Sequence, residues 1–134
     1  MHESLDLIMN QLDLLDTLLH LEDSLVSDFL RRSNTMPYFC VSWVLTWCSH
    51  DLHDFSKITR LFDLFIASNP LMALYLSARV IISRRKKLLL LECDSSIIHA
   101  FLSKFPQEID VDELIFRTLQ LYQKYPPHEL QAIS

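Results

Sequence analysis

The chain has 134 residues, enough for one domain with a hydrophobic core and too few for two. It contains no glycine, so the left-handed turns of β-hairpins and the glycine-rich loops that bind nucleotide phosphates are not expected. Its net charge of −5 has the wrong sign for a nucleic-acid-binding surface. The composition therefore predicts an all-α fold in a single domain, residues 1–134, with no cofactor and no nucleic-acid partner.

Three helices are expected in the first part of the chain. Between residues 5 and 21, apolar residues recur at helical spacing with acidic residues between them. A short helix over residues 24–32 follows. Pro37 then suits the first turn of a third helix, which we expect to run to about residue 48.

The next two helices are separated by Asn69 and Pro70. The first is expected over residues 54–67, with Phe55 and later aromatic residues on the side that faces the core. Asn69 can cap the second helix and Pro70 can occupy its first turn. This second helix is apolar almost all round as far as residue 82, so we expect it to be central, and it is too short to span a membrane.

Two further helices complete the prediction. Asp94 is expected to cap a helix over residues 95–105, and Asp110, with Glu113 in a capping-box pattern, a last helix that prolines 126 and 127 stop. The total is about seven helices. The basic run at residues 84–87 is expected at a solvated helix end, where cations complement the helix dipole; contact with lipid headgroups or an acidic partner is the alternative.

The three cysteines indicate a reduced compartment. They are odd in number and form no CxxC pair. If Cys40 and Cys48 share one helix, ~12 Å of helical rise separates them, which is too far for a disulfide. The N-terminus is acidic and amphipathic, unlike a secretory signal. We therefore expect a cytoplasmic protein.

Potential metal ligands are densest at His50, Asp51, His53 and Asp54. The two histidines could share a helical face, but no HExxH pattern surrounds them. A loop-and-cap role, at the boundary between two helices, is the preferred interpretation. No serine, cysteine or threonine has a suggestive base beside it. No catalytic, cofactor-binding or metal-binding residue is therefore predicted.

Arg60 and Asp63 lie three residues apart on a strongly apolar helix. This spacing predicts a mostly buried ion pair, whose loss would be costly because one charge would be left unpaired.

A set of motifs resembles the C-terminal half of a TBC domain, the all-helical module that activates Rab GTPases. Its most recognisable mark is the arginine–aliphatic–aromatic–aspartate sequence from Arg60 to Asp63, and Trp43 and Pro70 belong to the same structural motif. The resemblance covers nearly the whole chain and is closest to the branch associated with the endoplasmic reticulum. Its further elements are Ser42, Trp47, Asp54-Phe55, Phe65, Asn69, Leu71-Met72, Asp94, His99, Leu102-Ser103, Pro106-Gln107, Leu114-Ile115 and Pro126 to Leu130.

The resemblance also implies that both catalytic side chains of the family are missing. TBC domains supply an arginine finger from an IxxDxxR motif and a glutamine finger from a YxQ motif, both in their N-terminal half. Leu25, Asp28 and Arg31 spell LxxDxxR, but they lie where the family has a helix of its second half. Arg31 is therefore expected to be a solvated helix-end residue. No YxQ occurs, since Tyr122 and Gln123 are adjacent.

Together these observations predict a partial Rab-GAP TBC domain that is not itself an enzyme. We expect a truncated gene product or partial gene sequence, a Rab-type GTPase as partner, and a role in vesicle traffic near endoplasmic reticulum or Golgi membranes. The apolar surface of the first helices is expected to be open and to promote self-association. The alternatives are a helical interaction module unrelated to Rab, and an enzyme whose site is assembled in space around His50 and His53.

Overall fold

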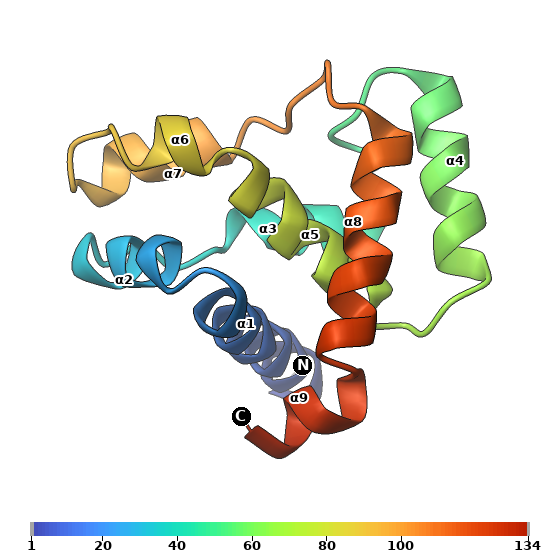
Figure 1. Cartoon of the computed structure of the whole chain (residues 1–134), viewed down its shortest axis with the longest axis horizontal. Coiled ribbons are helices and arrows are strands. Elements are labelled where there is room, and N and C mark those ends of the chain that lie inside the picture. The colour runs from blue at the N-terminus through green and yellow to red at the C-terminus, as the bar shows by residue number, and fades with distance from the viewer. Residues whose placement is uncertain (1, 134) are drawn as a thin grey trace.

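The computed structural model describes residues 2–133, over which it has nine helices and no strand. The all-α fold is therefore confirmed, with more helices than the seven expected (Figure 1). The additional ones are a single basic turn and a C-terminal helix. In chain order the helices are α1 (His2–Glu22), α2 (Ser24–Arg32), α3 (Phe39–Thr46), α4 (Phe55–Ile66), α5 (Met72–Ser83), α6 (Arg85–Leu88), α7 (Ser95–Leu102), α8 (Val111–Lys124) and α9 (Pro127–Ile133).

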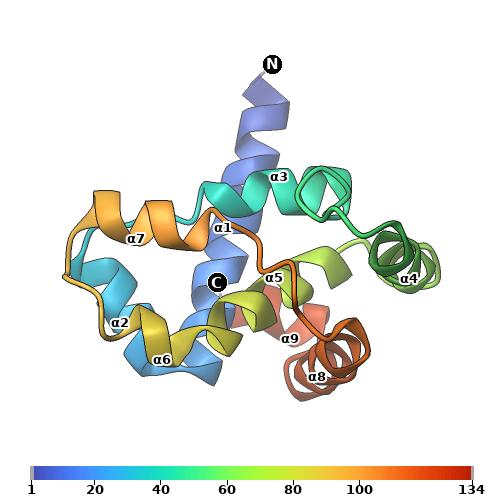
Figure 2. The same ribbon diagram turned by 90° about the horizontal axis from the view of Figure 1, so that it is seen from above.

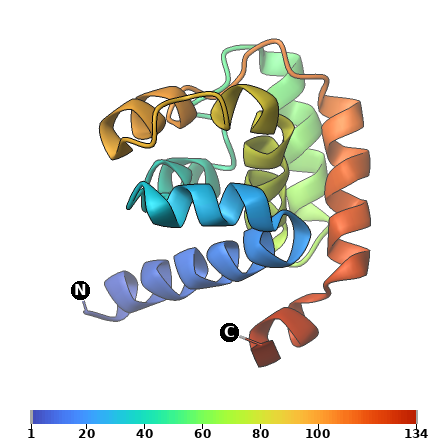
Figure 3. The ribbon, with the colours of Figure 1, turned by 60° about the vertical axis from the view of Figure 1, so that its left-hand side comes forward.

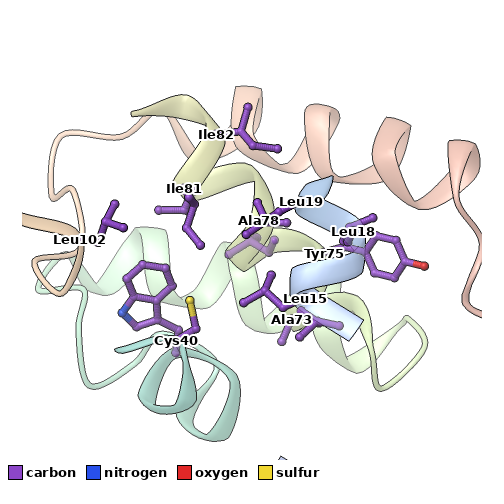
Figure 4. Close-up of a cluster of buried hydrophobic side chains, with 14 of the residues drawn as sticks. Leu15, Leu18, Leu19, Cys40, Ala73, Tyr75, Ala78, Ile81, Ile82 and Leu102 are labelled. Atoms are coloured by element: carbon purple, nitrogen blue, oxygen red, sulfur yellow. The ribbon is translucent and has the colours of Figure 1, made fainter. Parts of the chain in front are cut away.

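Helix α5 is central, as its apolar sequence predicts. Ten of its twelve residues are buried, and it packs against α1, α3 and α8. Figure 4 shows Ala73, Tyr75 and Ala78 of α5 among Leu15, Leu18 and Leu19 of α1. Burial of these apolar side chains is the main term that stabilises the fold. Helix α4, by contrast, lies at the edge of the molecule beside α8 (Figures 1 and 2).

Four aspartates cap the helices, and three of them were predicted. The carboxylate of Asp54 accepts bonds from the amides of Ser56 and Lys57, and Asp94 and Asp110 do the same at α7 and α8. Asp23 caps α2 in the same way. Each bond satisfies an amide that the first turn of a helix leaves without a partner.

The prolines mark helix boundaries less exactly than the sequence suggests. Pro70 lies in an exposed turn, and α5 begins two residues later, because Asn69 accepts the amide of Leu71 and closes a turn ahead of the helix. Similarly, Pro37 precedes α3 by two residues. Residues 126 and 127 do stop α8, but Pro127 also begins α9, since a proline lacks only an amide that the first turn does not use.

Among the residues that the structure describes, three adopt left-handed backbone angles. They are Asn34, Trp47 and Cys48, with φ angles of 56°, 51° and 66°. The last two follow each other at the end of α3, where the amide of Cys48 donates to the carbonyl of Trp43 at 2.9 Å. A left-handed residue with a side chain costs about 1–2 kcal/mol. The lack of glycine therefore does not remove such turns, and tertiary packing offsets their cost.

Candidate functional site

Trp43, the first residue of the family motif, lies in the core. It is fully buried on α3, with its ring 5.1 Å from that of Phe105 and 5.4 Å from that of Phe39. Its Nε1 has no hydrogen-bond partner among the described residues. Trp43 therefore joins α3 to the segment after α7 through ring contacts.

Trp47 fixes the start of the loop that leads to α4. Its ring packs against Phe62 at 5.2 Å and Phe65 at 5.5 Å, so the left-handed residue at the end of α3 is held by two aromatic residues of α4. The expected core-facing aromatic side of α4 is correct for Phe65 and wrong for Phe55. Phe55 is 77% exposed, because it is the first residue of an edge helix.

The predicted buried pair between Arg60 and Asp63 is wrong. Both residues are exposed, and Arg60 instead binds Asp112 on α8, with 2.6 Å between its Nη2 and the carboxylate. Asp63 adds only an electrostatic effect that raises the pKa of Arg60, after the larger effect of Asp112. Three residues along a helix bring two side chains to the same side, but here that side faces solvent. The motif arginine therefore joins α4 to α8 at the surface.

Gln107 is the residue that sequence reasoning missed. Its Oε1 accepts the amide of His53 at 2.9 Å, and its Nε2 donates to the carbonyls of Asp51 and Phe105 at 2.7 and 3.0 Å. Its backbone carbonyl accepts a bond from Lys57 Nζ. A half-buried glutamine thus holds the loop before α4 against the loop before α8. Pro106-Gln107 was part of the family resemblance, which was the available signal for this role.

The histidine-rich loop has the structural role that we preferred. Asp51 accepts a bond from Ser42 at 3.0 Å, Asp54 caps α4, and the amide of His53 binds Gln107. Among the side chains that the structure describes, no three of His, Cys, Asp or Glu come together in a way that could hold a metal ion. The proximity of these residues is therefore explained by loop geometry.

The buried cysteines are poor nucleophiles. Burial raises the pKa of Cys48 to about 12 and that of Cys40 well above its usual range. Both therefore remain neutral thiols near neutral pH. The structure describes all three cysteines as free thiols, and Cys93 is exposed.

Arg31, the residue that imitates the arginine finger, is bound within the fold. Its Nη2 lies 2.9 Å from the carboxylate of Asp16 on α1, and this hydrogen bond raises its pKa. Both side chains are about half exposed. Arg31 therefore pairs α2 with α1.

The basic run is only partly solvated, which corrects the prediction for it. Arg84 donates to the carbonyls of Phe101 and Lys104 and lies over the ring of Phe101. Arg85 binds Asp23 at 2.6 Å. The remaining two cations, Lys86 and Lys87, are exposed. Half of the run thus holds α6 to its neighbours.

The family model for the Rab-GTPase-TBC domain matches residues 1–90, more than half of the chain. The chain belongs to the Rab-GTPase-TBC domain family. The matched region of this TBC domain contains all four motif residues, Trp43, Arg60, Asp63 and Pro70. The resemblance inferred from the motifs is therefore confirmed.

Two relatives extend the match over most of the TBC chain. TBC1 domain family member 20 of Homo sapiens is 37% identical over 103 residues, which are 77% of this chain and 26% of the relative. The GTPase-activating protein gyp10 of Schizosaccharomyces pombe is 34% identical over 126 residues, which are 92% of this chain and 34% of the relative. The chain thus spans about a quarter to a third of the length of these relatives.

Among residues 2–133, no helix combines the length and the hydropathy that crossing a bilayer requires.

Proposed function

We propose that the chain provides the supporting half of a Rab-GTPase-TBC domain, which contacts a Rab-type GTPase but does not by itself accelerate GTP hydrolysis. Membership of the family supports the Rab partner. The observation that carries the rest is the ion pair between Arg31 and Asp16. An arginine finger must place its charge on the transferring phosphoryl group, and Arg31 is already bound to a carboxylate of its own chain.

No YxQ motif supplies a glutamine partner for Arg31. Tyr122 and Gln123 are adjacent on α8, and the ring of Tyr122 packs against Tyr75 at 5.1 Å. Helices α2 and α8 lie on opposite sides of α5 (Figures 1 and 2). The two fingers of a TBC domain act on one phosphate, so residues on these helices do not substitute for them.

Single-turnover GTP hydrolysis tests the catalytic part of the proposal. A Rab protein loaded with GTP is mixed with saturating chain, and no acceleration over intrinsic hydrolysis is expected. Arg31→Ala is compared with Arg32→Ala, which removes the neighbouring arginine. An acceleration of about a hundredfold or more that Arg31→Ala abolishes and Arg32→Ala leaves intact would contradict the proposal.

Rab contact is tested separately, by pull-down with GTP-loaded and GDP-loaded Rab proteins. Asp63 is suited to probing this contact, because it is exposed and makes no hydrogen bond or ion pair within the described part of the chain. Asp63→Ala should therefore leave the fold unchanged, so that a loss of Rab capture in this variant would place the contact on α4. Capture of no Rab protein in either nucleotide state would favour the helical interaction module instead.

The proposed partner also suggests where the chain works. A Rab-binding TBC domain acts in vesicle traffic, from the cytoplasm and at the periphery of endoplasmic reticulum or Golgi membranes. Cell fractionation of a tagged chain tests this location. Recovery in an unrelated compartment, such as the mitochondrial matrix, would contradict it.

Self-association is proposed for the seam between α1 and α3. Leu12 of α1 and Val41, Val44 and Leu45 of α3 line a shared hollow there. Leu45 is 65% exposed, and Leu7, nearer the start of α1, is 61% exposed. Apolar side chains gathered at one seam favour association. Light scattering on dilution should show a concentration-dependent mass, and Leu45→Glu should reduce it. A constant monomer mass would refute this part.

A further inference from the structure

Arg79 is the charged residue of α5, the central helix. The eleven other residues of α5 are uncharged, and ten residues of the helix are buried. Arg79 itself is half-buried, and its Nε is enclosed with no hydrogen-bond partner among residues 2–133. An enclosed N–H group is normally hydrogen-bonded, because one without a partner loses its hydration without compensation.

The carboxylates around Arg79 already bind other cations. Glu22, Asp23 and Glu113 are close enough to affect the pKa of Arg79, although burial has the larger effect and lowers it. Each carboxylate has a cation of its own at 2.6–3.0 Å. These cations are Lys124 for Glu22, Arg85 for Asp23 and Arg117 for Glu113. Each of these three carboxylates therefore binds a cation other than Arg79.

Arg79 lines a hollow of about 450 Å³ between α5 and the start of α8. Figures 1 and 3 show these two helices side by side. Arg117 lines the hollow from α8, together with Asp110, Glu113 and the apolar residues Ile109 and Leu114. The unpaired guanidinium thus borders a space large enough for a small group.

We propose that this hollow is a receptor for a single carboxylate group, such as an acidic side chain of a bound protein, held by Arg79 with Arg117 beside it. A planar guanidinium offers two parallel N–H donors, which match the two oxygens of a carboxylate. Asp110 and Glu113 in the same lining disfavour a doubly charged phosphate. A singly charged carboxylate therefore suits the hollow better. The proposal does not rest on the proposed Rab contact.

Nuclear magnetic resonance of the arginine Nε–H groups tests the proposal directly. Acetate is titrated into the whole chain at constant ionic strength, with chloride as the replaced anion. The Nε–H signal of Arg79, identified by its absence in Arg79→Met, is expected to shift saturably. The signal of Arg85, which is already bound to Asp23, is the internal control. No shift, or an equal shift of both signals, overturns the proposal.

Two further measurements separate the carboxylate site from other roles of Arg79. Arg117→Met should weaken acetate binding by about two- to fivefold, the usual effect of one partly exposed charge, whereas inorganic phosphate should bind more weakly than acetate. Tighter binding of phosphate overturns the carboxylate assignment. Arg79→Met should leave the melting temperature unchanged or raise it, because it removes an enclosed N–H group that has no hydrogen-bond partner. A melting temperature lowered by several degrees would show a structural role and overturn the proposal.

Discussion

Gln107 joins two loops that lie more than fifty residues apart in the sequence, and its replacement tests whether this link holds the fold together. Gln107→Ala removes three hydrogen bonds of 2.7–3.0 Å, to His53, Asp51 and Phe105. It keeps the backbone bond from Lys57 to residue 107. The change therefore isolates the side-chain link from the backbone contact with α4.

The expected loss follows from the number and burial of these bonds. Each contributes about 1 kcal/mol net, and the half-buried position lets water satisfy part of what is lost. We expect the free energy of unfolding to fall by about 2 kcal/mol. For a domain of this size, that lowers the melting temperature by about 8 °C. Circular dichroism melts measure the change, and Gln120→Ala, at an exposed position on α8, is the control.

The Gln107→Glu variant adds a pH dependence with a defined sign. Its carboxylate would face the carbonyl oxygens of Asp51 and Phe105, so folding would raise the pKa of that carboxylate above its unfolded value of about 4.3. The variant is then closest in stability to the wild type below about pH 4, and loses stability as pH rises through the folded-state pKa. A difference in melting temperature that does not grow with pH, or an unchanged melting temperature in Gln107→Ala, would refute the role of Gln107.

Three further variants test individual features of the fold by thermal melting. Asp63→Ala should leave the melting temperature unchanged, because Asp63 is exposed and Arg60 binds Asp112 instead. A large drop in melting temperature would support a buried ion pair between Arg60 and Asp63. Asn34→Val should cost about 1–2 kcal/mol, since a β-branched residue fits a left-handed position poorly, whereas Asn34→Gly should be nearly neutral. Asp110→Ala should lower the free energy of unfolding by about 1 kcal/mol, because α8 loses its cap. An unchanged melting temperature would show that water replaces the carboxylate.

Local signals in the sequence were sufficient to predict the starts of α4 and α7. The carboxylates of Asp54 and Asp94 each accept hydrogen bonds from the amides two and three residues later in the sequence. Both caps can therefore be inferred without knowledge of the tertiary structure. The central position of α5 follows in the same way, because a helix that is apolar nearly all round has to be covered on several sides.

Contacts between distant residues could not be predicted in this way. The partner of Arg60 is 52 residues away on α8, and nothing near Arg60 in the sequence distinguishes Asp112 from Asp63. The exposure of Phe55 has a related cause. Periodicity shows which side of α4 is apolar, but the extent to which neighbouring helices cover that side depends on how α4 and α8 pack. Gln107 likewise acquires its partners only when two loops meet.

The family match ends at residue 90, but the cluster of buried apolar side chains extends beyond it. Seven buried apolar side chains lie after that point: Ile98, Leu102, Phe105, Val111, Leu114, Leu121 and Leu130. At about 1.5–3 kcal/mol each, their loss removes about 10–20 kcal/mol of burial free energy, as much as the whole stability of a typical domain, about 5–15 kcal/mol. A fragment of residues 1–90 should therefore bind a hydrophobic dye and melt without a cooperative transition, whereas the full chain should melt cooperatively. If the fragment melts cooperatively near the melting temperature of the full chain, the reasoning is refuted. The core would then be complete without α7, α8 and α9.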